Sequence, residues 1–273
     1  MPSPASQPQP FSAASALPFY NALRALNPVV QCLTNDVVQA FTANALLAIG
    51  ASPAMVVAEE EAPGFAALAD AVLINVGTVQ APLAKSMLLA AAAARAHGTP
   101  WVLDPVALGV LPYRAGVVNE LLQHRPTAIR GNAAEILFMA GRASQAKGAD
   151  SLDSAHAALE AAQELAARQD CIVAVTGEVD YVTDGKRTLA VYGGHVNLTR
   201  VTGAGCSLSA MVAAFMAHTE PDRLDAAASA CLLMKTAGQA AAKSPMGSAG
   251  LGSFAVALLD GLSLPPDQLL SAS

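Results

Sequence analysis

The stretch "AVLINVGTVQAPLAKSMLLAAAAARAHGTPWVLDP" (residues 71–105) holds two short apolar runs with a long Ala- and Leu-rich run between them. The two short runs, residues 71–77 and 100–105, are typical of strands that are buried on both faces. The long run begins at Pro82 and stops at Gly98, which are residues that favour the first turn and the end of a helix. Parallel strands need a crossover of this kind, so the stretch predicts a strand–helix–strand unit.

The same alternation continues through the rest of the chain. Further strands are expected at residues 28–34, 127–132 and 171–177, and further helices at residues 38–50, 222–243 and 253–262. Residues 177–195 are β-rich around a "TDGK" turn, which predicts a hairpin at an edge of the sheet. Alternating strands and helices give an α/β fold with a mainly parallel central sheet and helices on both faces. We expect a single domain at residues 21–273, preceded by a flexible lead-in at residues 1–20.

The composition argues against several classes of function. The chain has 273 residues and a net charge of −6, and it lacks a run of Lys and Arg that could neutralise a nucleic-acid backbone, so no nucleic-acid partner is expected. Its four cysteines lie far apart, which argues against zinc sites and disulfides and fits a reducing compartment. The sequence shows neither a membrane-spanning apolar stretch nor the pattern of a signal peptide. We therefore expect a cytoplasmic protein with no membrane partner.

Polar residues follow the expected strands at the edge where an open α/β sheet binds ligands. Those that directly follow or end an apolar run are Asn35, Asn75, Asp104, Arg130 and Thr176. Asp104 could hold Mg²⁺ through water or orient a nucleophile, or it could cap a turn. Glu135 lies one helical turn beyond Gly131 and is expected to face the same cleft as Arg130. A guanidinium suits phosphate, whereas the carboxylate of Glu135 suits either a metal or a solvated helix face.

The segment "VTGAGC" (Val201–Cys206) precedes an apolar run that is expected to be helical. Backbone N–H groups at a helix start form an anion site for which phosphate is the natural ligand, and a tight turn with close packing is the alternative. Cys206 stands at this helix start, where the helix dipole is expected to lower the pKa of its thiol. The residue could act as a nucleophile or base, or it could be an inert buried side chain. For Cys171 and Cys231, inside apolar runs, packing is the expected role.

Six ordered blocks between Pro28 and Leu208 resemble one known family. The blocks are "LTNDVVQAFTANALLAIGASPAM", "LINVGT", "VLDPV", "AIRGNAAEI", "VTGEVD" and "VTGAGCSL". In these blocks the chain is similar to hydroxyethylthiazole kinases, which have the ribokinase-like fold. The family phosphorylates the primary alcohol of 4-methyl-5-(2-hydroxyethyl)thiazole in thiamine salvage. The resemblance therefore implies ATP as co-substrate, Mg²⁺ as cofactor, and a homotrimer whose active sites are shared between neighbouring subunits.

The resemblance also implies roles for residues on the substrate side. Asn35, Val37 and Met55 would form the wall of the thiazole site, and Gly203 would lie beside the substrate alcohol. Cys206 takes the place where most relatives in the superfamily have an Asp that acts as general base. The resemblance therefore implies that Cys206 is catalytic.

Four further residues match the nucleotide side of the family pattern. Arg130 and Thr176 would contact the phosphates of ATP, and Asp104 and Glu135 would be the carboxylates associated with Mg²⁺. The chain departs from the family at Ala107, where relatives usually have a glycine. This exchange adds a Cβ to the loop after Asp104, so the path of that loop is a question for the structure.

Two other functions are compatible with the same residues. A related kinase could phosphorylate another small alcohol, such as a pyrimidine or a sugar, although the apolar surroundings of Met55 lack the many hydrogen-bond partners that a sugar needs. The Cys in place of Asp also leaves room for a protein that binds thiazole or nucleotide without catalysis. Release of ADP with a panel of alcohols separates these alternatives.

Overall fold

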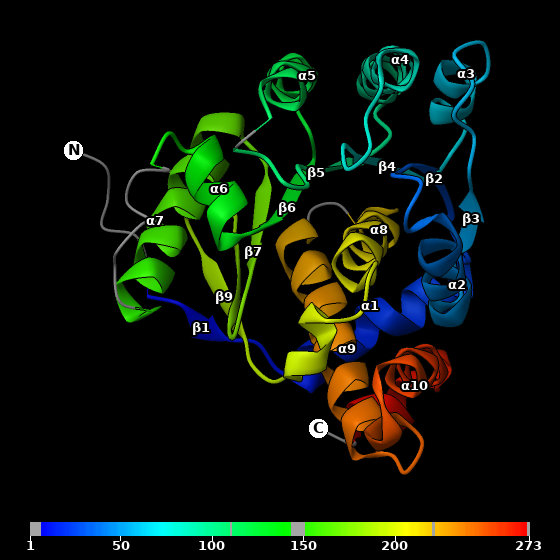
Figure 1. Cartoon of the computed structure of the whole chain (residues 1–273), viewed down its shortest axis with the longest axis vertical. Coiled ribbons are helices and arrows are strands. Elements are labelled where there is room, and N and C mark those ends of the chain that lie inside the picture. Colours follow the sequence, from blue (N-terminus) through cyan, green and yellow to red (C-terminus); the bar gives the residue numbers. More distant parts are fainter. Residues whose placement is uncertain (1–6, 110, 143–150, 220–221, 272–273) are drawn as a thin grey trace.

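A nine-stranded sheet runs through the computed structural model, which describes residues 7–109, 111–142, 151–219 and 222–271. Within these residues the strand order is β1-β9-β8-β7-β6-β5-β4-β2-β3, and helices lie on both faces of the sheet (Figure 1). The expected α/β fold with a mainly parallel sheet is therefore confirmed.

Five parallel strands form the centre of this sheet. They are β7 (Ile172–Thr176), β6 (Ala128–Asn132), β5 (Trp101–Asp104), β4 (Ala71–Asn75) and β2 (Val29–Leu33), with β3 (Ser52–Ala54) parallel at the outer edge. In register, Asn75 pairs with Asp104 and Asn132 pairs with Thr176. The polar strand ends that were predicted from the sequence therefore meet at one edge.

A hairpin extends the sheet beyond β7, as the sequence predicts. It consists of β8 (Asp180–Thr183), which is antiparallel to β7, and β9 (Thr188–Val191), which is antiparallel to β8. The short strand β1 (Gln9–Pro10) pairs in parallel with β9 and ends the sheet on this side.

The first part of the chain differs from the flexible lead-in expected at residues 1–20. Besides β1, the helix α1 (Ala13–Leu26) already begins in this segment, where the side chain of Ser12 accepts a hydrogen bond from the backbone N–H of Ser15. Three residues at helical spacing, Ala16, Tyr20 and Leu23, are buried against the core. This burial corrects the expectation for residues 7–20, and residues 1–6 lie outside the described part.

The helices form two layers, one on each face of the sheet (Figure 1). The first layer contains α3 (Ala62–Ala66), α4 (Ala81–His97), α5 (Pro112–Leu122), α6 (Ala133–Met139) and α7 (Ser151–Gln169). The second contains α1, α2 (Gln39–Ile49), α8 (Ala204–Met216), α9 (Arg223–Lys243), α10 (Leu251–Ser263) and α11 (Pro266–Ser271). Two short 3₁₀ helices, η2 (Val196–Thr199) and η3 (Gly247–Ala249), complete the second layer. None of the helices in the described ranges is long and apolar enough to cross a membrane.

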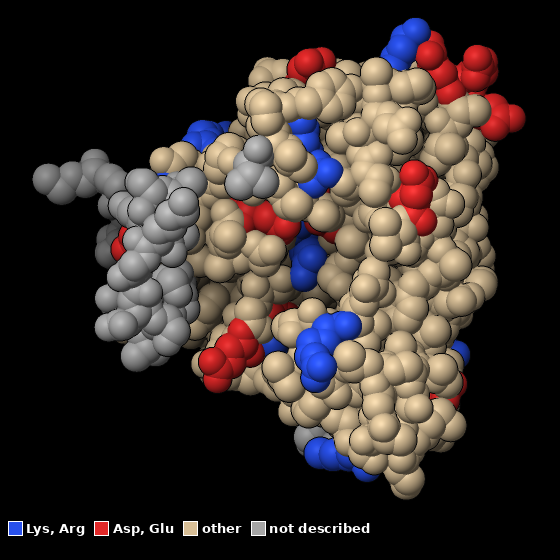
Figure 2. Space-filling model, viewed as in Figure 1, with Lys and Arg blue, Asp and Glu red and all other residues tan. Residues whose placement is uncertain are grey.

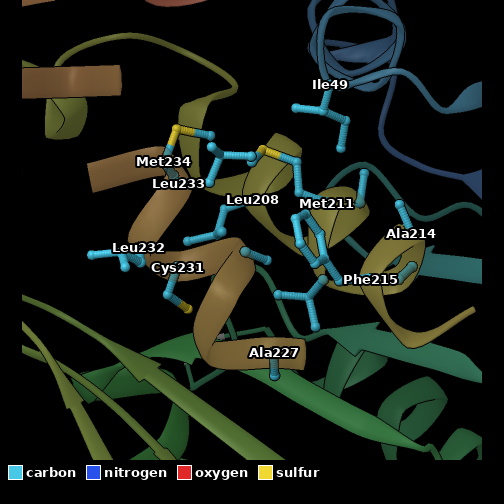
Figure 3. Packing of buried hydrophobic residues seen from close by; sticks show 14 of the residues in the cluster. Ile49, Leu208, Met211, Ala214, Phe215, Ala227, Cys231, Leu232, Leu233 and Met234 are labelled. Atoms are coloured by element: carbon cyan, nitrogen blue, oxygen red, sulfur yellow. The ribbon is translucent and has the colours of Figure 1, made fainter. Parts of the chain in front are cut away.

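Each central strand contributes alternately to two separate apolar cores. Val72 and Ile74 pack in one core, whereas Leu73 between them packs in the other. Burial of a Leu, Ile or Val side chain stabilises the fold by about 1.5–3 kcal/mol. Figure 3 shows part of the core that contains Leu73; there Met211 and Phe215 of α8 pack with residues of α9. The central strands are therefore held between both helical layers.

Glycines end two of the helices that lead into parallel strands, α2 before β3 and α4 before β5. Gly50 ends α2 and Gly98 ends α4, both with a positive φ and with backbone N–H groups that bond to carbonyls of the last helical turn. These endings agree with the sequence prediction, because a residue without Cβ adopts a positive φ at little cost. The helix α8 instead begins at a glycine with positive φ, Gly203, and this start lies beside the polar edge of the sheet.

Candidate active site

A cleft of about 390 Å³ lies at the carboxyl ends of the central strands, beside the start of α8. Six of the residues singled out in the sequence line it: Asp104, Arg130, Glu135, Thr176, Gly203 and Cys206. Figure 2 shows a hollow on this face in which basic and acidic side chains gather, while much of the surface around it is uncharged. The fold therefore brings together strand ends that are far apart in the sequence.

Asp104 ends β5 and is buried, with 1% of its surface exposed. Its Oδ2 accepts hydrogen bonds from Asn75 Nδ2 at 2.7 Å and from Ser209 Oγ at 2.8 Å. No described residue donates to its Oδ1. Burial raises the pKa of Asp104 from 3.8 to about 7; the nearby Arg130 lowers this pKa, and Glu135 raises it. Asp104 thus has one oxygen fixed by the protein and one available to a ligand.

Arg130 projects from β6 toward the start of α8. Its Nη2 donates a hydrogen bond of 2.6 Å to Thr176 Oγ1, and Thr176 Oγ1 donates to the carbonyl of Gly131. A Cβ at Gly205 would lie 3.0 Å from Arg130 Nη1, so the guanidinium lies closely against the backbone of α8. This contact explains a small residue at position 205, and it places a fixed positive charge next to the helix start.

Glu135 is buried and not on a solvated helix face, with 7% of its surface exposed. Its Oε2 accepts from the backbone N–H of Asn132, whose side chain in turn accepts from the N–H of Glu135, which forms a capping box at the start of α6. Its Oε1 accepts from the N–H of Ala107 at 2.8 Å. Glu135 therefore fixes the loop after β5 as well as the start of its own helix.

The loop after β5 keeps a glycine-like path although Ala107 replaces the glycine of the family pattern. Ala107 has a φ of 55°, in the left-handed region that disfavours a Cβ by about 1–2 kcal/mol. Arg114 of α5 supports the loop by donating to the carbonyls of Val106 and Gly77. The backbone contacts to Glu135 and Arg114 therefore hold a conformation that Ala107 itself does not favour.

Cys206 is half-buried in the first turn of α8, and its Sγ accepts a hydrogen bond of 3.5 Å from Asn35 Nδ2. Burial, and next the negative charge of Asp104, raise the pKa of the Cys206 thiol. The expectation that the helix start lowers this pKa is wrong, because loss of solvent outweighs the favourable dipole. A neutral thiol therefore predominates at pH 7. Cys171 and Cys231 are buried, as expected for packing residues.

A chain of hydrogen bonds connects Cys206 to Asp104. Asn35 Nδ2 also donates to Asn75 Oδ1 at 2.9 Å, and Asn75 Nδ2 donates to Asp104. Both asparagines are buried, so their amide groups have a single arrangement that satisfies these bonds. Ser209, one helical turn beyond Cys206, completes the network and has no signal in the sequence apart from this spacing.

Three predicted residues, Asn35, Val37 and Met55, do not line the cleft, although Asn35 contacts Cys206 at its edge. Val37 is 67% exposed, and Met55 is half-buried against the core that contains α8. Of the three residues expected at the thiazole wall, only Asn35 reaches the edge of the cleft, and Val37 is open to solvent; Gly203, expected beside the alcohol, lines the cleft. At Gly203 the φ is 95°, and a Cβ would lie 3.1 Å from the Phe41 ring.

Sequence reasoning missed a buried ion pair in the wall of the cleft. Lys235 of α9 and Asp180 of β8 are 5% and 3% exposed, and Lys235 Nζ lies 3.3 Å from Asp180 Oδ1. Burial raises the pKa of Asp180, and the positive charge of Lys235 opposes this shift. The only sequence signal for Lys235 is a single charge within an apolar helical run.

Of the three carboxylates that line the cleft, Asp104 and Glu135 fit a hydrated Mg²⁺, whereas Asp180 is paired with Lys235. This ion usually keeps several waters and binds one or two carboxylates together with substrate phosphates. Asp104 Oδ1 is a buried oxygen without a donor, and Glu135 lies close enough to affect the pKa of Asp104. Among the described residues, no group of three or more His, Cys, Asp or Glu side chains could form a closed metal site. The donor set therefore suits a cation that arrives with phosphate.

The comparisons with known proteins identify the family. The model of the hydroxyethylthiazole kinase family matches residues 20–267. The hydroxyethylthiazole kinase of Pectobacterium carotovorum is 54% identical over 257 residues, which cover 94% of this chain and 96% of that relative. The corresponding protein of Tolumonas auensis is 52% identical over 258 residues, covering 94% of this chain and 96% of the relative.

Solved structures agree with this assignment. The structure of hydroxyethylthiazole kinase from Pyrococcus horikoshii superposes with a TM-score of 0.85 at 39% identity, covering 94% of this chain and 95% of that one. A ribokinase-like superfamily protein from Enterococcus faecalis, at 15% identity and a TM-score of 0.61, covers 98% of this chain and 92% of that chain and shares the fold. The fold is ribokinase-like, and the chain is an enzyme that belongs to the hydroxyethylthiazole kinase family.

Proposed function

We propose that the protein transfers the γ-phosphoryl group of ATP to the hydroxyl of 4-methyl-5-(2-hydroxyethyl)thiazole. The observation that carries this proposal is that Arg130, the start of α8 and the buried carboxylate of Asp104 line the same cleft. Phosphoryl transfer depends mainly on positioning and on neutralising charge, and this arrangement offers both. Membership of the family, with relatives more than half identical, supports the same reaction and ATP as its co-substrate.

On the nucleotide side, Arg130 binds phosphate oxygens with the guanidinium edge that does not contact Thr176. The backbone N–H groups at the start of α8 donate hydrogen bonds to oxygens of the phosphoryl group during its transfer, because they have no partner within the helix. Asp104, with Glu135 next to it, holds Mg²⁺ through water. When bound, this ion neutralises part of the phosphate charge.

On the alcohol side, Asn35, Gly203 and Cys206 surround the hydroxyl, with Val37 and Met55 along the thiazole ring. The raised pKa of Cys206 means that its thiol is mainly neutral at pH 7. A loose transition state releases the alcohol proton late, so a group that is seldom ionised is sufficient to receive it. In this role Cys206 touches the reacting oxygen and is a catalytic residue.

Two substitutions at position 206 test this role. We expect Cys206→Ala to lower kcat by about tenfold or more and Cys206→Asp to keep or improve it, because a carboxylate is a better proton acceptor at pH 7. The measurement is ADP release in a coupled assay with MgATP and the thiazole alcohol. Full turnover in Cys206→Ala would show that the thiol does not take the proton. Cys231→Ala, in the buried part of α9, is the matched control for loss of a thiol.

The same assay with a panel of alcohols tests the substrate. ADP release only with the thiazole alcohol supports the proposal, whereas release with a pyrimidine or sugar alcohol identifies a kinase for another substrate. Nucleotide binding without ADP release from any alcohol identifies a protein that has lost catalysis. Replacement of Arg130 by Ala is expected to weaken ATP binding, and unchanged ATP affinity would remove the phosphate role from Arg130.

We also propose that the protein is a homotrimer in which neighbouring subunits complete the thiazole site. The exposure of Val37 in one chain supports this arrangement, because an apolar ring needs a covered wall. Size-exclusion chromatography with light scattering gives the mass directly. A monomer that turns over the thiazole alcohol at the full rate would contradict the shared site.

A further inference from the structure

Lys235 is a buried cation for which the proposed reaction has no direct use. It lies on α9 among apolar and small residues and is 5% exposed. A lysine in such a place needs compensation, because burial of an unpaired ammonium costs several kcal/mol. Its contacts therefore indicate what holds it there.

Four oxygens surround the ammonium of Lys235. Its Nζ donates to the carbonyls of Gly177 at 3.1 Å, Glu178 at 2.9 Å and Gly193 at 3.2 Å, and Asp180 Oδ1 lies 3.3 Å away. Three of these four oxygens belong to the backbone. Asp180 Oδ1 also accepts from the N–H of Gly177, which closes the turn after β7. One cation thus joins two separate chain segments.

Both of these segments lead to walls of the cleft. The first directly follows Thr176, whose hydroxyl accepts from Arg130. The second precedes η2, which carries the cleft residues Leu198 and Thr199. The second segment approaches Lys235 closely because it contains Gly194, where φ is 89° and a Cβ would lie 3.3 Å from Lys235 Cγ.

We propose that Lys235 is a positioning residue for the nucleotide: its ammonium holds the turn after β7 and the segment before η2 together, and so sets the affinity for ATP. The inference rests on the proposed function only in taking this part of the cleft as the nucleotide side. Lys235 acts through Thr176 and η2, and the alcohol side at Asn35 and Cys206 is independent of it.

Replacement by an apolar side chain of similar length tests the inference. We expect Lys235→Met to raise the KM for ATP and the dissociation constant of a fluorescent ADP analogue by about tenfold or more, since small displacements of binding groups cost this much. The KM for the thiazole alcohol is expected to change by less than about twofold. Equal loss of affinity for both substrates, or no loss for nucleotide, would overturn the proposal. Lys243→Met, exposed at the end of the same helix, is the matched control.

A double substitution separates loop positioning from the effect of an unpaired acid. Lys235→Met leaves Asp180 buried without its partner, whereas Lys235→Met with Asp180→Asn removes both charges and still leaves the three carbonyls unbound. We expect the double variant to keep the weak nucleotide binding. Recovery of wild-type affinity in the double variant would mean that Lys235 only neutralises Asp180, and this would contradict the proposal.

Chemical rescue keeps the test independent of how well one variant folds. In Lys235→Ala, n-propylammonium replaces the missing atoms and their N–H donors, and we expect it to restore nucleotide affinity at least fivefold. Tetramethylammonium at the same concentration has the charge but no N–H donor and is expected to restore none. Rescue by both ions, or by neither in a folded variant, would contradict a role through hydrogen bonds. Binding of the ADP analogue can be measured even if the wild-type protein does not phosphorylate the thiazole alcohol. Failure of the proposed function can therefore be distinguished from failure of the inference about Lys235.

Discussion

At the scale of single residues, Asp104 shows a conflict between stability and ligand binding. Burial raises its pKa to about 7, whereas the same carboxyl group titrates near 3.8 when exposed. Between these two pH values the folded protein binds a proton that the unfolded chain releases, so stability falls as pH rises through this range. Above pH 7 the folded protein contains a buried carboxylate, which a cation or a phosphate-bound metal can compensate. Above pH 7 Asp104 therefore lowers the stability of the free protein, and a bound cation compensates its charge in the complex.

The prediction that follows is a stabilised but inactive variant. At pH 8, without ligand, Asp104→Asn is expected to raise the free energy of unfolding by several kcal/mol, because the pKa rise of Asp104 from 3.8 to about 7 corresponds to about 4 kcal/mol. At pH 5 the gain is expected to be smaller by at least about 2 kcal/mol, because Asp104 is then protonated in the folded protein, and it vanishes only below about pH 3.8. Urea unfolding at both pH values measures this difference. Asp260→Asn on the exposed side of α10 is the control, and an equal gain at both pH values would contradict the titration of Asp104.

At the scale of elements, α8 organises the cleft. Gly205 and Ser209 lie one turn apart on the same face and contact Arg130 and Asp104, while Cys206 between them contacts Asn35. One short turn of helix therefore fixes the distances between the phosphate side and the alcohol side. This arrangement requires a residue without a side chain at position 205, where the guanidinium crosses the helix.

Gly205→Ala is expected to displace the Arg130 guanidinium, because the new Cβ would lie 3.0 Å from Nη1. The expected result is a rise in the KM for ATP of roughly tenfold or more, with the fold retained. Steady-state kinetics and thermal unfolding measure the two effects. In Gly116→Ala, an exposed position of α5 with no atom within 4 Å of the new Cβ, stability is expected to rise by about 0.5–1 kcal/mol with unchanged kinetics. If both variants behave alike, the close approach at Gly205 has no role.

The elements and the strand-end residues could be predicted because their signals are local. Apolar runs with Gly50 and Gly98 at helix ends give the alternation directly, and the carboxyl ends of parallel strands must share an edge. The pKa of Cys206 and the position of Lys235 could not be predicted, because both depend on burial by segments distant in sequence. The segment containing Tyr20 was misjudged for the same reason, since its partner surface comes from the other end of the chain.

At the scale of the whole molecule, the two ends of the described chain are held together by α1. The hydroxyl of Tyr20 donates to the carbonyl of Leu262 at 2.9 Å, and Arg24 adds contacts to the carbonyl of Leu264. The ring of Tyr20 is buried and lies near Phe215 of α8, with ring centroids 6.2 Å apart. The N-terminal helix thus closes the core that supports the active-site helix.

Tyr20→Phe tests the polar part of this closure. We expect the free energy of unfolding to fall by about 1 kcal/mol, because the carbonyl of Leu262 loses its donor while the ring stays packed. The kinetic constants are expected to stay unchanged, since Tyr20 contacts none of the cleft residues directly. Chemical denaturation and steady-state assays on the same preparation provide both measurements. A change in KM without a change in stability would be inconsistent with a purely structural contact.

The side chains of β4 and β5 pack alternately in two cores, so both faces of these strands are covered. Amides in strands covered on both faces open only when most of the molecule unfolds, on a far slower timescale than ligand exchange. Asn75 and Asp104 end these strands, so we expect their backbone to keep its position when a substrate enters. We therefore expect entry and release of ligands to depend on the loops beyond the strand ends, while the backbone that carries Asn75 and Asp104 stays in place from one turnover to the next.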